Sequence, residues 1–258
     1  MSAQAAVIIP ARYGSARLPG KPVLPKAREV TGKYIIQHVY ERAAKARSAA
    51  VVIVATDDRR VADAVRDFGG LVRMTRDDHA SGTDRIAEVA AGLDHPVVVN
   101  VQGDEPEILP EQVDQVVRLL DDDPEASMST LATPIETAET WRNPNVVKVV
   151  LDRRGRALYF SRSPIPYARD YEGPPPGAPA RPLHHLGIYG YRRDFLLRYA
   201  DLPASALEAS EKLEQLRALE AGFAIKVGIT HHRPIGIDTQ ADLEAWLARH
   251  RADEEGAP

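Results

Sequence analysis

The stretch VVIVATDD (51–58) is an unbroken run of apolar, mostly β-branched residues that ends in two aspartates. Comparable runs lie on either side of it, AVIIP (6–10) and PVVVNVQGDEP (96–106). Apolar residues also recur at helical spacing from Tyr34 to Ala46 and from Glu111 to Leu120. A strand that is buried on both faces reads as a continuous apolar run, because helices cover each face of the sheet. The pattern therefore predicts a Rossmann-like α/β fold with a mostly parallel sheet.

The pattern changes after residue 125, where strand-like runs follow one another without helices between them. We expect a smaller, mostly antiparallel insertion, residues 126–222, in an α/β core formed by residues 1–125 and 223–258. One helix is predicted from Glu208 to Ala221, closed by Gly222. The strand-like runs are SMSTLATPI (127–135), VVKVVLD (146–152), ALYFSRSPIP (157–166) and HLGIYGY (185–191), and Asp152 to Gly155 form a predicted hairpin turn.

The composition narrows the functional classes. The 258 residues carry a formal net charge of −4 and include no cysteine. A nucleic-acid coat or a polybasic membrane binder needs a strong positive field, so neither partner is expected. Without cysteine, disulfides, thiolate catalysis and cysteine-ligated zinc are excluded. No stretch approaches the roughly 20 apolar residues of a membrane helix, and the sequence predicts a cytoplasmic protein.

Three cations, Arg12, Arg17 and Lys21, follow the first predicted strand in a loop that also contains Gly14 and Gly20. Ligands of open α/β sheets bind at the carboxyl ends of the strands. The glycines let backbone N–H groups approach an anion, and the cations offset its charge. The loop matches neither the dinucleotide fingerprint nor the P-loop. It is either a phosphate site or a solvated basic turn, and its position favours phosphate.

Two carboxylates, Asp104 and Glu105, follow the third buried strand. Carboxylates at a strand end can hold Mg²⁺ together with substrate phosphates and water. Asp is also common where a strand ends in a Gly- and Pro-containing turn. The residues alone leave both interpretations open.

The segment HASGTDR (79–85) permits two interpretations. Ser81 and Gly82 are small enough for close backbone contact with a flat base. Ser81 or Thr83 can equally cap a helix that carries Ile86 and Val89.

Several polar residues of the second half are candidates for ligand contact. His185 and Tyr189 alternate with apolar residues, so we expect them on one face of a strand, as a polar wall or as buried aromatic residues. His184 is expected to be exposed. Glu211 lies four residues before Gln215 on the predicted helix and is interpreted as a solvated charge.

Ordered motifs along the chain resemble the CMP-Kdo synthetases (3-deoxy-manno-octulosonate cytidylyltransferases). The resemblance implies a nucleotidyltransferase fold and the reaction CTP + Kdo → CMP-Kdo + pyrophosphate, which activates Kdo for lipopolysaccharide synthesis. It also implies a homodimer in which the insertion binds the sugar and pairs the subunits. The motifs are VIIPARYGSARLPGKP (7–22), TDD (56–58), HASGTDR (79–85), VNVQGDEP (99–106), NPNVVKVV (143–150), ALYFSR (157–162), HLGIYGY (185–191), LEQLRAL (213–219) and IDT (237–239).

The resemblance also implies roles for individual residues. Asp104 and Asp238 would hold Mg²⁺, although Asp238 could instead support a helix start in which Thr239 and Asp242 form a capping box. Catalysis is expected from Arg12, Lys21, Asp104 and Asp238. The nucleotide would contact Arg12, Arg17, Lys21, Ser81, Gly82 and Arg85, and the sugar Gln102, Arg162, His185, Tyr189, Glu214 and Gln215.

Three alternatives remain at this level. The sugar could be 8-amino-Kdo or a sialic acid, or the chain could be a non-catalytic nucleotide-sugar-binding protein.

One stretch also departs from the family pattern, because VLPKAREVTGKYIIQHV (23–39) is a few residues longer than usual and has Tyr34 where Pro is common. The segment 169–182 is rich in Pro and Gly and is predicted to be a long loop.

Overall fold

A computed structural model describes residues 4–14, 18–79, 81–167, 169, 180–203 and 205–255. The chain divides into two compact units: the first comprises Gln4–Asp114 with Pro234–Pro258, and the second comprises Gln115–Arg233. The observed divisions lie at 114/115 and 233/234, whereas the sequence pattern placed them at 125/126 and 222/223. Strand β9 (Ala224–Ile229) consequently belongs to the second unit.

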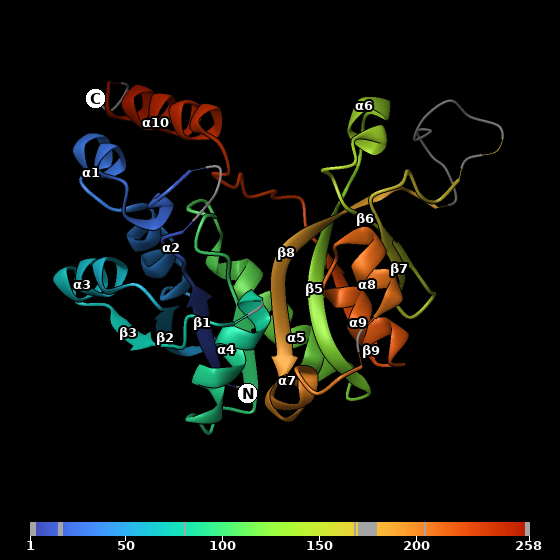
Figure 1. The fold of residues 1–258 in the computed structure, drawn as a ribbon. Coiled ribbons are helices and arrows are strands. Elements are labelled where there is room, and N and C mark those ends of the chain that lie inside the picture. Colours follow the sequence, from blue (N-terminus) through green and yellow to red (C-terminus); the bar gives the residue numbers. More distant parts are fainter. Residues whose placement is uncertain are drawn as a thin grey trace. The chain divides into compact units, whose positions relative to one another are not determined.

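The first unit contains a parallel sheet with the strand order β3-β2-β1-β4 (Figure 1). All three strands that the sequence predicted here are present, which confirms the α/β core. Strand β1 is buried almost throughout because helices cover its apolar residues. The elements are β1 (Ala5–Pro10), the 3₁₀ helix η1 (Lys21–Val23), α1 (Pro25–Thr31), α2 (Ile35–Ala43), β2 (Ala49–Thr56), α3 (Arg59–Asp67), β3 (Leu71–Met74), α4 (Gly82–Ala91), β4 (Val97–Asn100), the start of α5 (Pro110–Asp122), and α10 (Gln240–Glu255).

The stretch 23–39, which departs from the family pattern, forms helix α1 and the first part of helix α2. Helix α1 ends at Gly32, whose φ of 72° lies in the left-handed region that glycine adopts without strain. Arg28 Nη1 donates to the hydroxyl of Tyr34 at 2.6 Å, so Tyr34 fixes the junction between the two helices. Helix α10 packs on this region through an apolar cluster of buried residues. The cluster consists of Leu18, Ala27, Ile35, Ile237, Leu243, Trp246 and Leu247.

The second unit is mixed. Strand β5 pairs antiparallel with β8 and parallel with β9, and β6 and β7 form a hairpin beside β8 (Figure 1). The hairpin turn is the predicted one: Gly155 has a φ of 72°, and Asp152 Oδ1 accepts the N–H groups of Arg154 and Arg156. The elements are β5 (Ala126–Pro134), α6 (Ala138–Arg142), β6 (Lys148–Leu151), β7 (Ala157–Ser161), β8 (Leu183–Arg192), α7 (Arg193–Tyr199), α8 (Ala206–Glu211), α9 (Gln215–Glu220) and β9.

The single helix predicted from Glu208 to Ala221 is wrong. The chain leaves the helical conformation at Lys212, whose φ is 55°, and forms two short helices, α8 and α9, in its place. Glu211 and Gln215 therefore lie on different helices and share no helical face. The close of the second helix is as predicted, because Gly222 has a φ of 83°.

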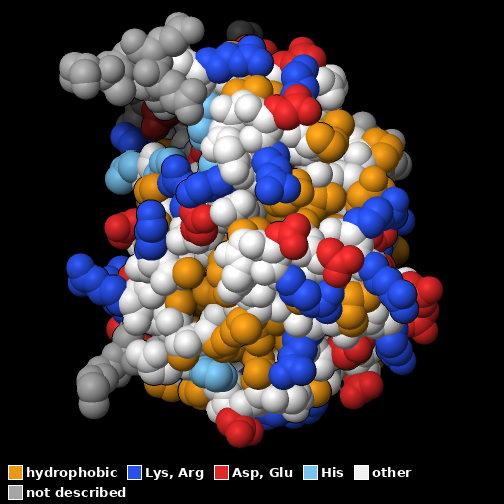
Figure 2. Space-filling model, turned by 90° about the vertical axis from the view of Figure 1, so that its left-hand side faces the viewer, with side chains coloured by type: hydrophobic (Ala, Val, Ile, Leu, Met, Phe, Trp, Pro, Cys, Tyr) orange, Lys and Arg blue, Asp and Glu red, His pale blue; other side chains and the backbone are white. Residues whose placement is uncertain are grey.

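Surface charge is mixed on the face drawn in Figure 2, where Lys and Arg side chains are interspersed with Asp and Glu. Among the described residues, no helix has both the length and the apolar character needed to cross a membrane. The predicted long loop, 169–182, lies mostly outside the described residues.

Candidate active site

The basic loop leaves strand β1 at its carboxyl end. Gly20 has a φ of 70°, and its N–H donates to the carbonyl of Tyr13 at 2.9 Å, which closes the loop before Lys21. The Tyr13 ring lies 3.0 Å from the position that a Gly20 Cβ would occupy, and the guanidinium of Arg60 lies 3.3 Å from the ring centroid. The sequence did not single out Tyr13. Arg17 lies outside the described residues.

The carboxyl end of strand β4 lies against this loop. A Cβ on Gly103 would come within 2.9 Å of the carbonyl oxygen of Pro10, so only glycine allows the two chain segments to approach this closely. The N–H of Ile237 donates to the carbonyl of Asp104 at 2.9 Å, which brings in the segment before α10. Three segments far apart in the sequence thus meet at one edge of the parallel sheet, as expected for ligand sites in such sheets.

Lys21 joins the two aspartates that the sequence singled out. Its Nζ lies 2.6 Å from Oδ2 of Asp104 and 3.0 Å from Oδ1 of Asp238. Burial by itself lowers the pKa of the Lys21 ammonium, but the two adjacent carboxylates outweigh burial and raise the pKa above its ordinary value. Burial, reinforced by Asp104 and Asp238, raises the pKa of the neighbouring Glu105 to about 8.

The residues that follow Asp238 cap the next helix, which was the alternative role predicted for Asp238. Asp242 Oδ2 accepts the N–H groups of Asp238 and Thr239 at 3.1 and 2.8 Å, and the N–H of Asp242 donates to Thr239 Oγ1 at 3.2 Å. Thr239 and Asp242 therefore form the capping box, and the side chain of Asp238 is left to contact Lys21.

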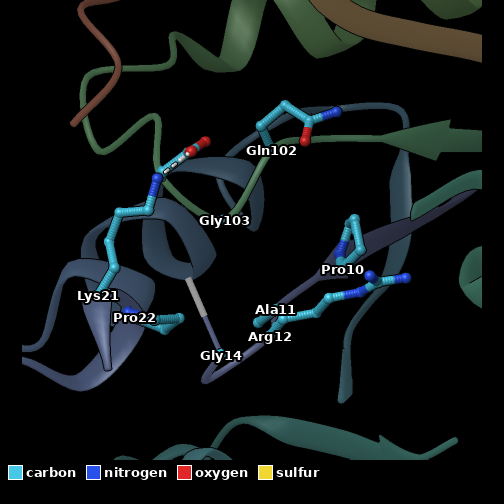
Figure 3. Close-up of a pocket in the computed structure, with 9 residues that line it drawn as sticks. Pro10, Ala11, Arg12, Gly14, Lys21, Pro22, Gln102 and Gly103 are labelled. Carbon is cyan, nitrogen blue, oxygen red and sulfur yellow. Dashed lines mark hydrogen bonds and ion pairs between the residues drawn. The ribbon is translucent and has the colours of Figure 1, made fainter. Parts of the chain in front are cut away.

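A cavity of about 240 Å³ opens beside these residues. Lys21 Nζ donates to the carboxylate of Asp104 at 2.6 Å. In Figure 3, the side chains of Lys21 and Arg12 point in different directions from the same loop. Arg12 Nη2 donates to the carbonyl of His79 at 2.6 Å, which ties the basic loop to the segment 79–85. The lining residues are Pro10, Ala11, Arg12, Gly14, Lys21, Pro22, Gln102, Gly103 and Asp104.

The segment 79–85 forms a helix start. Ser81 Oγ accepts the N–H of Asp84, and the Asp84 carboxylate accepts the N–H of Ser81, so the pair is a capping box. Arg85 has no exposed surface: its guanidinium donates to Asp57 Oδ2 at 2.7 Å and to the hydroxyl of Thr75. Arg85 therefore braces this segment in the structure, and its contact with the nucleotide stays a prediction.

The second unit contains most of the predicted sugar contacts. The rings of His185 and Tyr189 lie 5.3 Å apart, which confirms that they share a face, and Phe160 packs on His185 at 5.0 Å. Burial lowers the pKa of His185 to about 3, so its ring is neutral and hydrogen-bonds the hydroxyl of Thr130 through Nε2. His184 was expected to be exposed, but it is half-buried, and burial lowers its pKa to about 4.

Arg162 and Glu211 form a structural pair. Arg162 Nε donates to the carbonyl of Glu211 at 2.7 Å and Nη1 donates to the carbonyl of Pro144 at 3.0 Å. In return, Glu211 Oε2 accepts the N–H of Arg162 at 2.9 Å, and Oε1 accepts the hydroxyl of Ser161 at 2.6 Å. The interpretation of Glu211 as a solvated charge is wrong, because both carboxylate oxygens are bonded within the protein.

Gln215 and Glu214 begin helix α9. Gln215 is 4% exposed, and its Nε2 has no hydrogen-bond partner within the part of the chain that the structure describes. A buried amide donor without a partner costs free energy unless a ligand or water accepts its hydrogen bond. Glu214 is exposed beside it, so the pair offers one donor and one carboxylate to a polar ligand.

The fold and the first unit's site define a nucleotide-binding α/β enzyme of the nucleotidyltransferase class. A sequence profile described as cytidylyltransferase matches residues 6–227. The chain belongs to the cytidylyltransferase family and, within it, to the 3-deoxy-manno-octulosonate cytidylyltransferases.

Relatives of that name are similar over nearly their whole length. The chain is 53% identical to the 3-deoxy-manno-octulosonate cytidylyltransferase of Syntrophotalea carbinolica over 239 residues, covering 92% of this chain and 94% of the relative. It is 51% identical to that of Geobacter sulfurreducens over 247 residues, covering 94% and 97%. A solved CMP:2-keto-3-deoxy-manno-octonic acid synthetase complexed with CTP matches with a TM-score of 0.89 and 47% identity, over 97% of this chain and 99% of that one.

Proposed function

We propose that this enzyme transfers CMP from CTP to Kdo and releases pyrophosphate. The observation that carries the proposal is the meeting of Lys21, Asp104 and Asp238 at the carboxyl edge of the parallel sheet, beside the cavity that Arg12 lines. A triphosphate requires cations and a glycine-containing loop, and this edge offers both. The names of the relatives and the CTP complex of the solved neighbour support the same choice of nucleotide and sugar.

In the proposed reaction, the oxygen of the anomeric 2-hydroxyl of Kdo forms a bond to the α-phosphorus of CTP. The bond from that phosphorus to the pyrophosphate oxygen breaks, and the hydroxyl proton passes to solvent. Arg12 and Lys21 would offset the charge of the β- and γ-phosphates and of the departing pyrophosphate. Catalysis by such residues consists of positioning and of stabilising charge that develops on oxygen.

Asp104 and Asp238 fit a role as Mg²⁺ ligands. One ammonium contacts both carboxylates, so a single cation can contact both. Oxygen ligands suit Mg²⁺, which completes its coordination with substrate phosphates and water. Among the described residues no group of three or more His, Asp or Glu side chains is placed to hold a metal ion, and we propose these two aspartates as the protein's ligands. When bound, the ion would polarise phosphate oxygens and lower the barrier to attack on phosphorus.

The base and the sugar would each use residues already located. Ser81 and Gly82, at the start of α4, are proposed to lie against cytosine. His185, Tyr189, Glu214 and Gln215 would contact sugar hydroxyls, together with Gln102 from the cavity wall. The Nε2 of Gln215, which has no hydrogen-bond partner among the described residues, supports this assignment, since a hydroxyl of the ligand would accept its hydrogen bond. Kdo carries a carboxylate, and we propose Arg162 as its cation because a planar guanidinium suits a bidentate contact. The guanidinium would have to exchange a carbonyl partner for the sugar carboxylate.

We further propose a homodimer formed through the second unit, in the cytoplasm, where CTP is made. Leu158 on strand β7 is 63% exposed, and Tyr167, six residues after that strand ends, is 84% exposed, so both large apolar side chains are candidates for contact with a second subunit. Light scattering of the wild type and of Leu158→Glu tests the dimer: the variant should be monomeric.

Pyrophosphate release tests the function. It is measured with CTP, UTP, ATP and GTP, each combined with Kdo, 8-amino-Kdo and sialic acid. The proposal expects turnover with CTP and Kdo. Turnover only with 8-amino-Kdo or sialic acid would reassign the sugar, and turnover only with a purine triphosphate or a neutral sugar would overturn the proposal.

A further inference from the structure

The ammonium of Lys21 occupies the position between Asp104 and Asp238 that a metal ion would need. The Lys21 side chain is 11% exposed, whereas those of Asp104 and Asp238 are 30% and 46% exposed. The cation is thus the enclosed member of the trio, and the two carboxylates converge on it from separate segments. The contact with Lys21 joins the two carboxylates.

A divalent cation and the lysine cannot both occupy this position. Two like charges a few ångströms apart in a partly enclosed site repel by several kcal/mol at the effective dielectric of a protein. The lysine side chain, however, carries its charge on a flexible four-carbon stem and can leave while the backbone stays in place. Arg12, the other described cation of this loop, contacts the carbonyl of His79 instead.

We propose that Lys21 is the resident occupant of the metal position, and that a divalent cation enters only as the lysine moves to the incoming triphosphate. This inference rests on the metal site of the proposed function. It makes metal binding and nucleotide binding mutually dependent: the metal must displace the ammonium, and the triphosphate gives the displaced ammonium a new partner. A coupling of this kind is reciprocal, so each ligand tightens the binding of the other.

The inference predicts that the free enzyme binds divalent cations weakly and that substitution of Lys21 increases its affinity for them. Binding of Mn²⁺, as a probe for Mg²⁺, is measured by calorimetry and electron paramagnetic resonance without nucleotide. Lys21→Met should bind Mn²⁺ about tenfold more tightly than the wild type, within the usual range of coupling between sites. Adding Asp238→Asn to Lys21→Met should abolish the gain, because it removes one of the two ligands.

Lys26→Met is the matched control. Lys26 lies in the following helix, α1, and its Nζ is 4.0 Å from Glu244 with both side chains about half exposed. The same substitution there removes a surface charge without touching the aspartates, so Mn²⁺ affinity should not change. If Lys26→Met tightens Mn²⁺ binding as much as Lys21→Met, the gain reflects net charge and the proposal fails.

Lys21→Ala provides a second route if the methionine variant folds poorly. In the alanine variant, added methylammonium should compete with Mn²⁺, since it can restore an ammonium between the carboxylates.

In the wild type, Mn²⁺ with CTP should raise the melting temperature by more than the two ligands do separately. Equal Mn²⁺ affinity of wild type and Lys21 variants would overturn the inference and leave the metal site standing. Absence of Mn²⁺ binding in all of them, with and without CTP, would overturn the metal site as well, while the pyrophosphate assay still decides the reaction.

Discussion

The carboxylate of Glu211 accepts the backbone N–H of Arg162 at 2.9 Å and the hydroxyl of Ser161 at 2.6 Å, which ties the end of strand β7 to the end of helix α8. Glu211→Ala leaves both donors without this acceptor. We expect the free energy of unfolding to fall by about 1–3 kcal/mol, the usual cost of unsatisfied, partly buried polar groups. Urea unfolding followed by circular dichroism measures the loss.

Glu214→Ala is the control for this prediction. Glu214 is exposed and makes no side-chain cap at the start of helix α9. Its substitution should change the unfolding free energy by less than about 0.5 kcal/mol and act on the KM for Kdo instead. Equal stability of Glu211→Ala and the wild type would show that the two hydrogen bonds contribute nothing net.

The buried guanidinium of Arg85 gives a second prediction. Arg85→Lys keeps the positive charge but cannot contact both Asp57 and Thr75 through a planar fork. We expect a loss of about 1–3 kcal/mol in unfolding free energy and only a small change in the KM for CTP at a temperature where the variant is folded. A tenfold rise in KM for CTP with unchanged stability would instead establish direct contact with the nucleotide.

The sequence predicted the parallel core because its signal is local. A run such as PVVVNVQGDEP is apolar enough to identify a buried strand, and the end of such a strand in an open sheet identifies where ligands bind. The same reasoning missed strand β3, where Leu71 is 54% and Met74 45% exposed, because an edge strand needs no apolar run. It also missed the break at Lys212, since a non-glycine residue with positive φ has no reliable sequence signal.

The sequence also could not predict contacts between residues that are distant along the chain. The contacts of Glu211 with Ser161 and Arg162, and of Arg85 with Asp57, join residues 28 to 50 positions apart. From the sequence alone, a charged residue is interpreted as solvated or as ligand-binding, because its partner within the protein is not known. The family resemblance predicts the pairing of Asp104 with Asp238, whereas no sequence pattern predicts that Lys21 lies between them.

His185 should make the unfolding free energy depend on pH. Burial, with a smaller contribution from His184, lowers the pKa of His185 to about 3 in the folded protein, against about 6.5 in an unfolded chain. Below pH 6.5 the unfolded chain therefore binds a proton at His185 that the folded protein does not bind. The contribution of His185 to the free energy of unfolding is fully present above pH 6.5 and declines as the pH falls toward 3. The slope for one such histidine is about 1.4 kcal/mol per pH unit.

Urea unfolding of the wild type and of His185→Gln at pH 7.5, 6.0 and 5.0 isolates that slope by difference, because His184 and Glu105, whose pKa values are also shifted, titrate in both proteins. His185→Gln removes one titrating group, so the curve of unfolding free energy against pH should flatten by one proton even if the variant is less stable throughout. An unchanged slope would mean that the folded protein protonates His185 as readily as the unfolded chain does.

Asp104→Asn tests the carboxylate that contacts Lys21 most closely. The amide cannot offset a metal charge, so kcat should fall by a hundredfold or more, on the order of the loss of one strong electrostatic contact in a transition state. CTP binding, measured by calorimetry without a divalent cation, should largely survive, because the residues of the basic loop are unchanged. Near-normal kcat with Mg²⁺ would remove Asp104 from the proposed metal site.

The last prediction concerns the shape of the basic loop. Gly20 and Gly32 have nearly the same backbone conformation, with φ values of 70° and 72°. A Cβ on Gly20 would meet the Tyr13 ring at 3.0 Å, whereas a Cβ on Gly32 would meet no atom within 4 Å. Both Gly→Ala variants should therefore lose about 1–2 kcal/mol of stability from the left-handed conformation alone.

Only Gly20→Ala should also affect nucleotide binding, because the displaced Tyr13 ring is part of the loop that carries Arg12 and Lys21. We expect its KM for CTP to rise about tenfold, that is, by about 1.4 kcal/mol of lost binding, with no such rise in Gly32→Ala. Truncating the ring in the double variant Tyr13→Ala/Gly20→Ala should remove the collision and leave the strain. If KM rises equally in both single variants, the effect comes from general loosening of the region, and the Tyr13 ring does not shape the loop.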